Sequence, residues 1–86
     1  MSDRPLPPGG TQAQPVVVDA RGLRCPIPVI RAARAARDLR PGDLVEVLAT
    51  DPAAATDLAA WARMRGHHVE HLERADDLVR AVIRLG

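Results

Sequence analysis

The sequence predicts a two-layer α/β sandwich of the order β-α-β-α-β-β, with two helices on one face of a mixed four-stranded sheet. Two apolar runs each lead into a turn and a proline that suits the start of a helix, and two further extended segments close the chain. Right-handed crossovers then place both helices on the same side of the sheet. The 86 residues suffice for one small domain.

The N-terminal end differs in composition from the rest of the chain. Four prolines and two glycines fall within residues 1–15, which we expect to form a disordered tail before a domain over residues 16–86. A valine run then predicts a first strand over residues 16–19. This strand delivers the residues that follow it to the carboxyl edge of the sheet.

The first helix is expected to run from Pro26 to about Leu39, because the fixed φ of proline suits a first helical position. A period of 3.6 residues places one apolar face toward the sheet. That face is expected to contain Val29, Ala33 and Ala36, flanked by Ile30, Ala32 and Leu39.

The second half of the chain is expected to supply a helix and three strands. Asp51 is predicted to cap the helix, Gly66 to end it, and Trp61 to lie in the core. The many charges of the third strand suit a sheet edge. In order, the elements are a strand over residues 44–49, a helix over 52–66, an edge strand over 67–74 and a last strand over 78–85.

Cys25 is the only cysteine and lies at a strand-to-helix junction. Helix-terminal N–H groups and nearby cations favour thiolate over thiol, so we predict a reactive cysteine with a lowered pKa. The alternative is a packing residue, for which a prolyl turn between arginines is a poor place. Arg31 and Arg34 lie on the polar helix face, which is either ordinary solvated surface or a docking site. The residues expected to tune the thiol or dock a partner are Arg21, Arg24, Pro26, Pro28, Arg31 and Arg34.

The run Gly22-Leu23-Arg24-Cys25-Pro26-Ile27-Pro28, preceded by Asp19, resembles the signature of the TusA-like (SirA-like) sulfur-carrier family. The resemblance covers roughly residues 16–86 and implies the strand order 1-2-4-3. It marks Asp19 and Asp57 without revealing a task for either. Later landmarks that agree with the family pattern are Gly42, Thr50-Asp51-Pro52, Asp57-Leu58 and Gly66-His67.

The resemblance implies a small carrier that holds sulfane sulfur as a persulfide on Cys25. Its donor would be a cysteine desulfurase or a rhodanese-type sulfurtransferase, and its acceptor a relay protein with a reactive cysteine. If such a carrier counts as an enzyme, it is a transferase, and no cofactor is implied. The pathway stays open among tRNA thiolation, cofactor biosynthesis, selenium handling and sulfur oxidation.

His67, His68 and His71 are the residues that invite a metal hypothesis, but we expect no metal site. In a strand, His68 and His71 would point to opposite faces, whereas zinc needs three or four convergent ligands.

Two other classes of protein remain as alternatives: a nucleic-acid-binding module and a regulatory interaction module with an incidental cysteine. A net charge of +1 and a single aromatic residue argue against direct nucleic-acid binding. Seven of the twelve arginines precede Pro41, so the basic side lies toward the cysteine.

We also expect a cytoplasmic protein without membrane attachment, and a monomer with weak self-association through Leu44, Leu48 and Val82 on the open sheet face.

Overall fold

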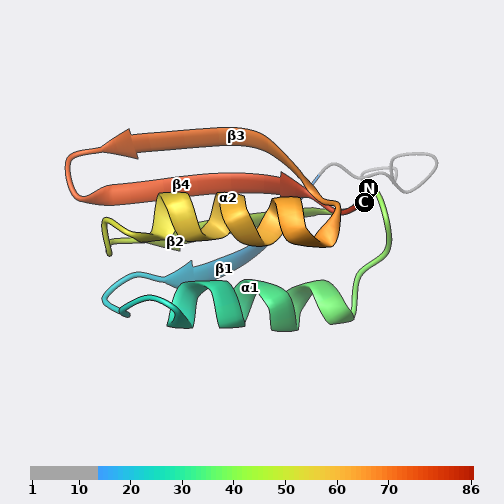
Figure 1. The fold of residues 1–86 in the computed structure, drawn as a ribbon, viewed down its shortest axis with the longest axis horizontal. Coiled ribbons are helices and arrows are strands. Elements are labelled where there is room, and N and C mark those ends of the chain that lie inside the picture. Colours follow the sequence, from blue (N-terminus) through green and yellow to red (C-terminus); the bar gives the residue numbers. More distant parts are fainter. Residues whose placement is uncertain (1–13) are drawn as a thin grey trace, which may run out of the picture.

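The computed structural model describes residues 14–86, so most of the predicted tail lies outside the described residues. Four strands form one sheet in the order β1-β2-β4-β3, and two helices lie against one face of it (Figure 1). The two-layer α/β sandwich and the strand order predicted from the resemblance are therefore confirmed. The elements are β1 (Val16–Ala20), α1 (Ile27–Arg37), β2 (Leu44–Ala49), α2 (Ala54–Arg65), β3 (His68–Ala75) and β4 (Leu78–Arg84).

The sheet is mixed because only its first pair of strands is parallel. β1 pairs with β2 in parallel, whereas β4 pairs with both β2 and β3 in antiparallel fashion. The crossover through α1 makes the parallel pair, as a βαβ unit requires. β3 is an edge strand and is exposed along its whole length, as its charged sequence predicts.

The core lies between the sheet and the two helices and is aliphatic apart from Trp61. Alternate residues of β2 and β4 face the helices and are buried, while the residues between them face the open side. Trp61 is 8% exposed, so its predicted place in the core is confirmed. The largest fully buried side chains are Leu58, Ile83, Val45, Val47 and Pro28.

Helix α1 packs on the core through its expected face, since Val29, Ala33 and Ala36 lie against the core as predicted. Ala32 is fully buried at its centre, whereas Ile30, expected to flank the apolar face, is 44% exposed. The small alanine side chain lets the helix approach the sheet closely. The helix also begins one residue later than expected, with Pro26 at the N-cap.

Helix α2 begins at Ala54, and its N-cap is Ala53 rather than Asp51. Asp51 instead closes a turn just ahead of the helix, because its Oδ1 accepts from the Ala53 N–H at 2.8 Å and its carbonyl accepts from the Ala54 N–H at 2.9 Å. Gly66 ends the helix in the left-handed conformation with φ of 76°, as predicted for its C-terminus.

The register of β3 contradicts the expected placement of its histidines. An irregularity between Val69 and His71 leaves Glu70 outside the residue-by-residue register with β4, although its side chain still pairs with Arg84 of that strand. His68 pairs with Arg84 and His71 with Val82, so both histidines face the open side of the sheet. An extra residue in one strand reverses the alternation beyond it, and the prediction of opposite faces was wrong for that reason.

The open face carries both apolar side chains and ion pairs. Arg80 lies between Glu46, at 2.6 Å, and Glu73, at 3.8 Å, and Glu73 also contacts His71 at 2.8 Å. Around these pairs lie the half-buried side chains of Leu44, Leu48 and Val82, as predicted. Within residues 14–86, no helix is both long and apolar enough to cross a membrane.

Candidate functional site

Cys25 lies in the loop between β1 and α1. In Figure 1 this loop, the connection from β2 to α2 and the turn from β3 to β4 all lie at the same end of the sheet. The thiol is free and half-buried, and its side chain packs against the margin of the core. The peptide bond between Cys25 and Pro26 is cis. The thiol is thus accessible from one end of the domain while its backbone is anchored to the rest of the fold.

Two tight turns shape the loop. The Leu23 N–H donates to the Ala20 carbonyl at 3.2 Å, and the Ile27 N–H donates to the Arg24 carbonyl at 2.8 Å. Gly22 lies inside the first turn with φ of 81°, a conformation that side chains with a Cβ adopt only at a cost. The glycine of the signature is therefore needed for the backbone path to Cys25.

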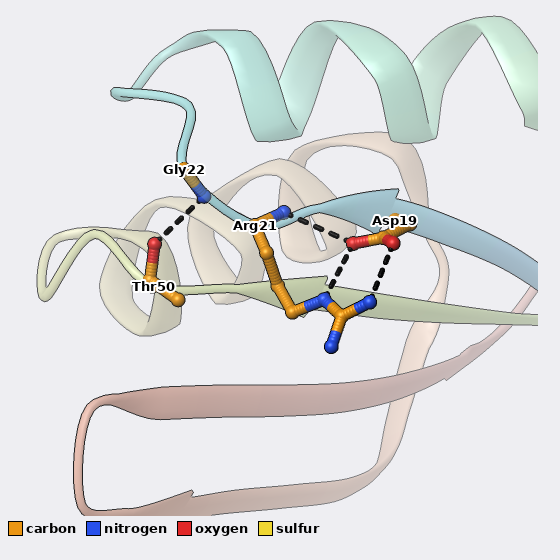
Figure 2. Close-up of polar contacts among 4 residues, drawn as sticks. All are labelled: Asp19, Arg21, Gly22 and Thr50. Carbon is orange, nitrogen blue, oxygen red and sulfur yellow. Dashed lines mark hydrogen bonds and ion pairs between the residues drawn. The ribbon is translucent and has the colours of Figure 1, made fainter.

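The connection from β2 to α2 holds this loop through two side chains. The Gly22 N–H donates to Thr50 Oγ1 at 2.9 Å (Figure 2), and the Cys25 N–H donates to Asp51 Oδ2 at 3.0 Å. Each contact joins residues more than 25 positions apart in the sequence. The Thr50-Asp51 pair, one of the later landmarks of the family pattern, therefore fixes the position of the Cys25 backbone.

Asp19 and Arg21 form a closed ion pair on the outer side of the loop. The guanidinium donates to both carboxylate oxygens at 2.8 Å, and the Arg21 N–H donates to Oδ1 at 3.2 Å (Figure 2). Hydrogen bonding from Arg21 lowers the pKa of Asp19 to about 2. Asp19 thus holds the Arg21 side chain in place and balances its positive charge.

The thiol of Cys25 does not have the lowered pKa that the sequence predicts. Burial, hydrogen bonding to Asp57 and the negative charges of Asp51 and Asp57 together raise its pKa to about 11, and burial is the largest of these causes. No arginine among residues 14–86 contributes to this shift. The expectation that Arg21 and Arg24 favour the thiolate was wrong, since burial and acids from a distant part of the chain act on the thiol instead.

The structure separates the other predicted site residues into two groups. Arg24, Arg31 and Arg34 are exposed, and so is Pro26 beside the thiol. Pro28 is fully buried under the first turn of α1, so it packs the core and cannot touch a partner. Burial excludes a direct docking contact through Pro28, and its other predicted role, in tuning the thiol, stays a prediction.

Sequence reasoning missed three residues that contact or act on the cysteine loop: Thr50, Asp51 and Asp57. Asp51 and its neighbours stood out only as a helix cap and as landmarks of the resemblance. Their proximity to Cys25 depends on the parallel pairing of β1 with β2, which places Ala20 beside Ala49. Within residues 14–86, no three His, Cys, Asp or Glu side chains converge as a metal site requires.

Fold and site together define a small α/β domain that presents a single anchored thiol at one end of its sheet. Residues 16–85 match the family model of Sulfurtransferase TusA. The sulfur carrier protein TusA of Pseudomonas aeruginosa is 41% identical over 66 residues, which are 76% of this chain and 84% of that protein. YrkF of Bacillus subtilis is 37% identical over 71 residues, which are 83% of this chain but only 38% of YrkF.

A solved structure agrees with these comparisons. The crystal structure of a SirA-like protein from Desulfitobacterium hafniense superposes with a TM-score of 0.73 at 35% identity, over 83% of this chain and 97% of that one. The chain therefore belongs to the TusA family, as its signature around Cys25 predicts.

Proposed function

We propose that this protein accepts sulfane sulfur as a persulfide on Cys25 and passes it to an acceptor cysteine on a partner protein. The observation that carries the proposal is the single free, half-buried thiol, held at the end of the domain by the Asp51 carboxylate. The domain over residues 16–86 supplies the whole site, and the partners supply the remaining chemistry.

The transfer conserves both atoms and electrons. Cys25 sulfur attacks the outer sulfur of a donor persulfide, the donor S–S bond breaks, and the donor cysteine leaves as a thiolate that takes up the proton lost by Cys25. The product is a persulfide on Cys25 and a reduced donor. The same exchange then takes place at the acceptor. The acceptor thiolate attacks the outer sulfur of the Cys25 persulfide, the S–S bond breaks, and Cys25 leaves as a thiolate.

The absence of a second cysteine from the sequence suits this role. A persulfide beside another thiol would collapse to an intrachain disulfide and lose its sulfur, whereas a lone cysteine must hand the sulfur to another protein. A reducing compartment keeps such a thiol free, so we place the protein in the cytoplasm.

We further propose that Arg24, Arg31 and Arg34 form a docking rim, with Pro26 beside the sulfur. The three arginines are exposed at the cysteine loop and along the first turns of α1. Ile27 and Ile30, which are 38% and 44% exposed on the same helix, would add apolar contact area between these charges. A donor such as a cysteine desulfurase or rhodanese, and an acceptor relay protein, would each present acidic groups to this rim.

Intact-mass analysis tests the proposed function. The purified protein is incubated with a cysteine desulfurase or a rhodanese and its sulfur substrate, and a product heavier by one sulfur atom is expected. Reduction should remove the added sulfur, and Cys25→Ser should not acquire it. Failure of every donor to add sulfur to the folded wild-type protein would overturn the proposal.

A further inference from the structure

The Asp51 carboxylate is fixed beside the reactive cysteine by two backbone hydrogen bonds. Oδ2 accepts from the Cys25 N–H at 3.0 Å, and Oδ1 accepts from the Ala53 N–H at 2.8 Å. Both oxygens are used, so the side chain cannot turn away without losing a bond. These same two bonds lower the pKa of Asp51, which is therefore an anion at neutral pH.

A second carboxylate that raises the pKa of the thiol belongs to Asp57, in the first turn of α2. Asp57 is half-buried, and its own N–H donates to the Ala53 carbonyl at 3.0 Å, so it follows directly from the turn that Asp51 closes. After burial, hydrogen bonding to Asp57 is the largest cause of the raised pKa of the thiol. The turn before α2 and the first turn of that helix thus each supply one carboxylate that disfavours ionisation of the thiol.

The positive charges at this end of the sheet do not offset them. Arg21 is paired with Asp19, and Arg24 acts on Asp51 rather than on the sulfur. Asp76 and Asp77, in the turn from β3 to β4, add two acids at the same end, whereas Arg74, which lines a pocket with them beside Thr50 and Pro52, adds one cation. The electrostatic environment of the resting thiol is therefore acidic, although the helix that follows it carries exposed arginines.

We propose that Asp51 and Asp57 keep the resting cysteine as a neutral thiol that is slow to react with small electrophiles, with Asp51 acting through its fixed position on the Cys25 backbone. This inference deepens the proposed function and rests on it for its biological meaning: an unloaded carrier keeps its thiol reduced until a partner removes the proton. Asp51 bonds to the backbone of Cys25 and not to its sulfur, so it is a positioning residue.

The experiment measures alkylation of Cys25 by iodoacetamide, a neutral reagent that loses iodide to the thiolate, from pH 7 to pH 10. The variants are Asp51→Asn and Asp57→Asn, and the matched control is Asp38→Asn, at the far end of α1. Each site variant is expected to shift the pH profile downward by up to about one unit, since one nearby charge is removed. The control should superimpose on the wild type.

The expected change in the alkylation rate is smaller than the change in the fraction of Cys25 that is ionised. A shift of about one unit raises the thiolate fraction about tenfold, while the accompanying loss of nucleophilicity is about threefold, so alkylation at pH 8 rises about threefold. Profiles for both site variants that coincide with the wild type would overturn the inference. Thermal melts establish whether each variant is folded. If Asp51→Asn does not fold, the inference is tested with Asp57→Asn alone.

No sulfur donor enters this assay, so its outcome is independent of persulfide loading. A shifted profile in a protein that never accepts sulfur would refute the proposed function and leave the acidic control of Cys25 intact. An unshifted profile in a protein that loads sulfur would do the opposite.

Discussion

Replacing Leu58 by alanine should remove a large part of the stability of this domain. Leu58 is 1% exposed, lies at the centre of the face that α2 presents to the sheet, and is the largest fully buried side chain. Truncating such a leucine costs about 2–5 kcal/mol, because transfer free energy is lost and a cavity remains. Small domains have only about 5–15 kcal/mol in total. We therefore expect Leu58→Ala to fold but to be marginal.

The change in melting temperature follows from the size of the chain. A loss of about 3 kcal/mol in a domain of 60–100 residues lowers the melting temperature by about 12–24 °C. Trp61 provides the signal, since it is the single aromatic residue, is 8% exposed, and lies one turn after Leu58 on the same helix. Urea unfolding followed by its fluorescence should show a lower midpoint with an unchanged slope.

Leu72→Ala is the matched control, because it deletes the same atoms from a side chain that is 42% exposed on the edge strand β3. This variant should lose less than about 1 kcal/mol of its free energy of unfolding, since the leucine side chain buries little apolar area in the folded protein. Equal losses for the two variants would refute the assignment of the core to the layer between α2 and the sheet.

Three further predictions concern the chain end, the open face and the docking rim. Deleting residues 1–14 should leave the melting temperature nearly unchanged, because their composition offers little apolar surface; a large fall would show that they pack. Leu48→Glu should abolish weak self-association in sedimentation at high concentration, and wild-type protein that is strictly monomeric there would contradict any role for this face. Arg31→Glu/Arg34→Glu should slow sulfur transfer to a partner at low salt while the alkylation rate of Cys25 stays nearly constant. A transfer rate indifferent to this charge reversal would assign partner recognition to another surface.

The elements of the fold could be predicted closely because each is encoded locally. Alternation along β2 and β4 and the glycine after α2 are short-range signals, and the structure follows them to within two residues. The register of β3 could not be predicted in this way. Every residue of that strand is exposed, so no buried face penalises a shift, and an extra residue at Glu70 reversed the side of His71.

The candidate site was predictable in position but not in electrostatics. Cys25 and the glycine that admits its turn are recognisable in one short run. The pKa of the thiol depends on burial and on Asp51 and Asp57, which the fold brings across from the β2–α2 connection and the first turn of α2. Arg21 is closer in sequence, yet it turns to Asp19, two residues away. Proximity along the chain was therefore a poor guide to which charges act on the sulfur.

The two kinds of charge around Cys25 act over different ranges, and salt can separate them. Arg24, Arg31 and Arg34 are exposed, so their attraction for an acidic partner is screened over about 10 Å at 0.1 M salt. Asp51 is bonded to the Cys25 backbone and acts at short range, where screening by salt is weak. Added salt should therefore slow sulfur transfer while the alkylation profile of Cys25 stays in place. If salt moved both together, the acids and the arginines would form one exposed field, and separate roles in protection and docking would have to be abandoned.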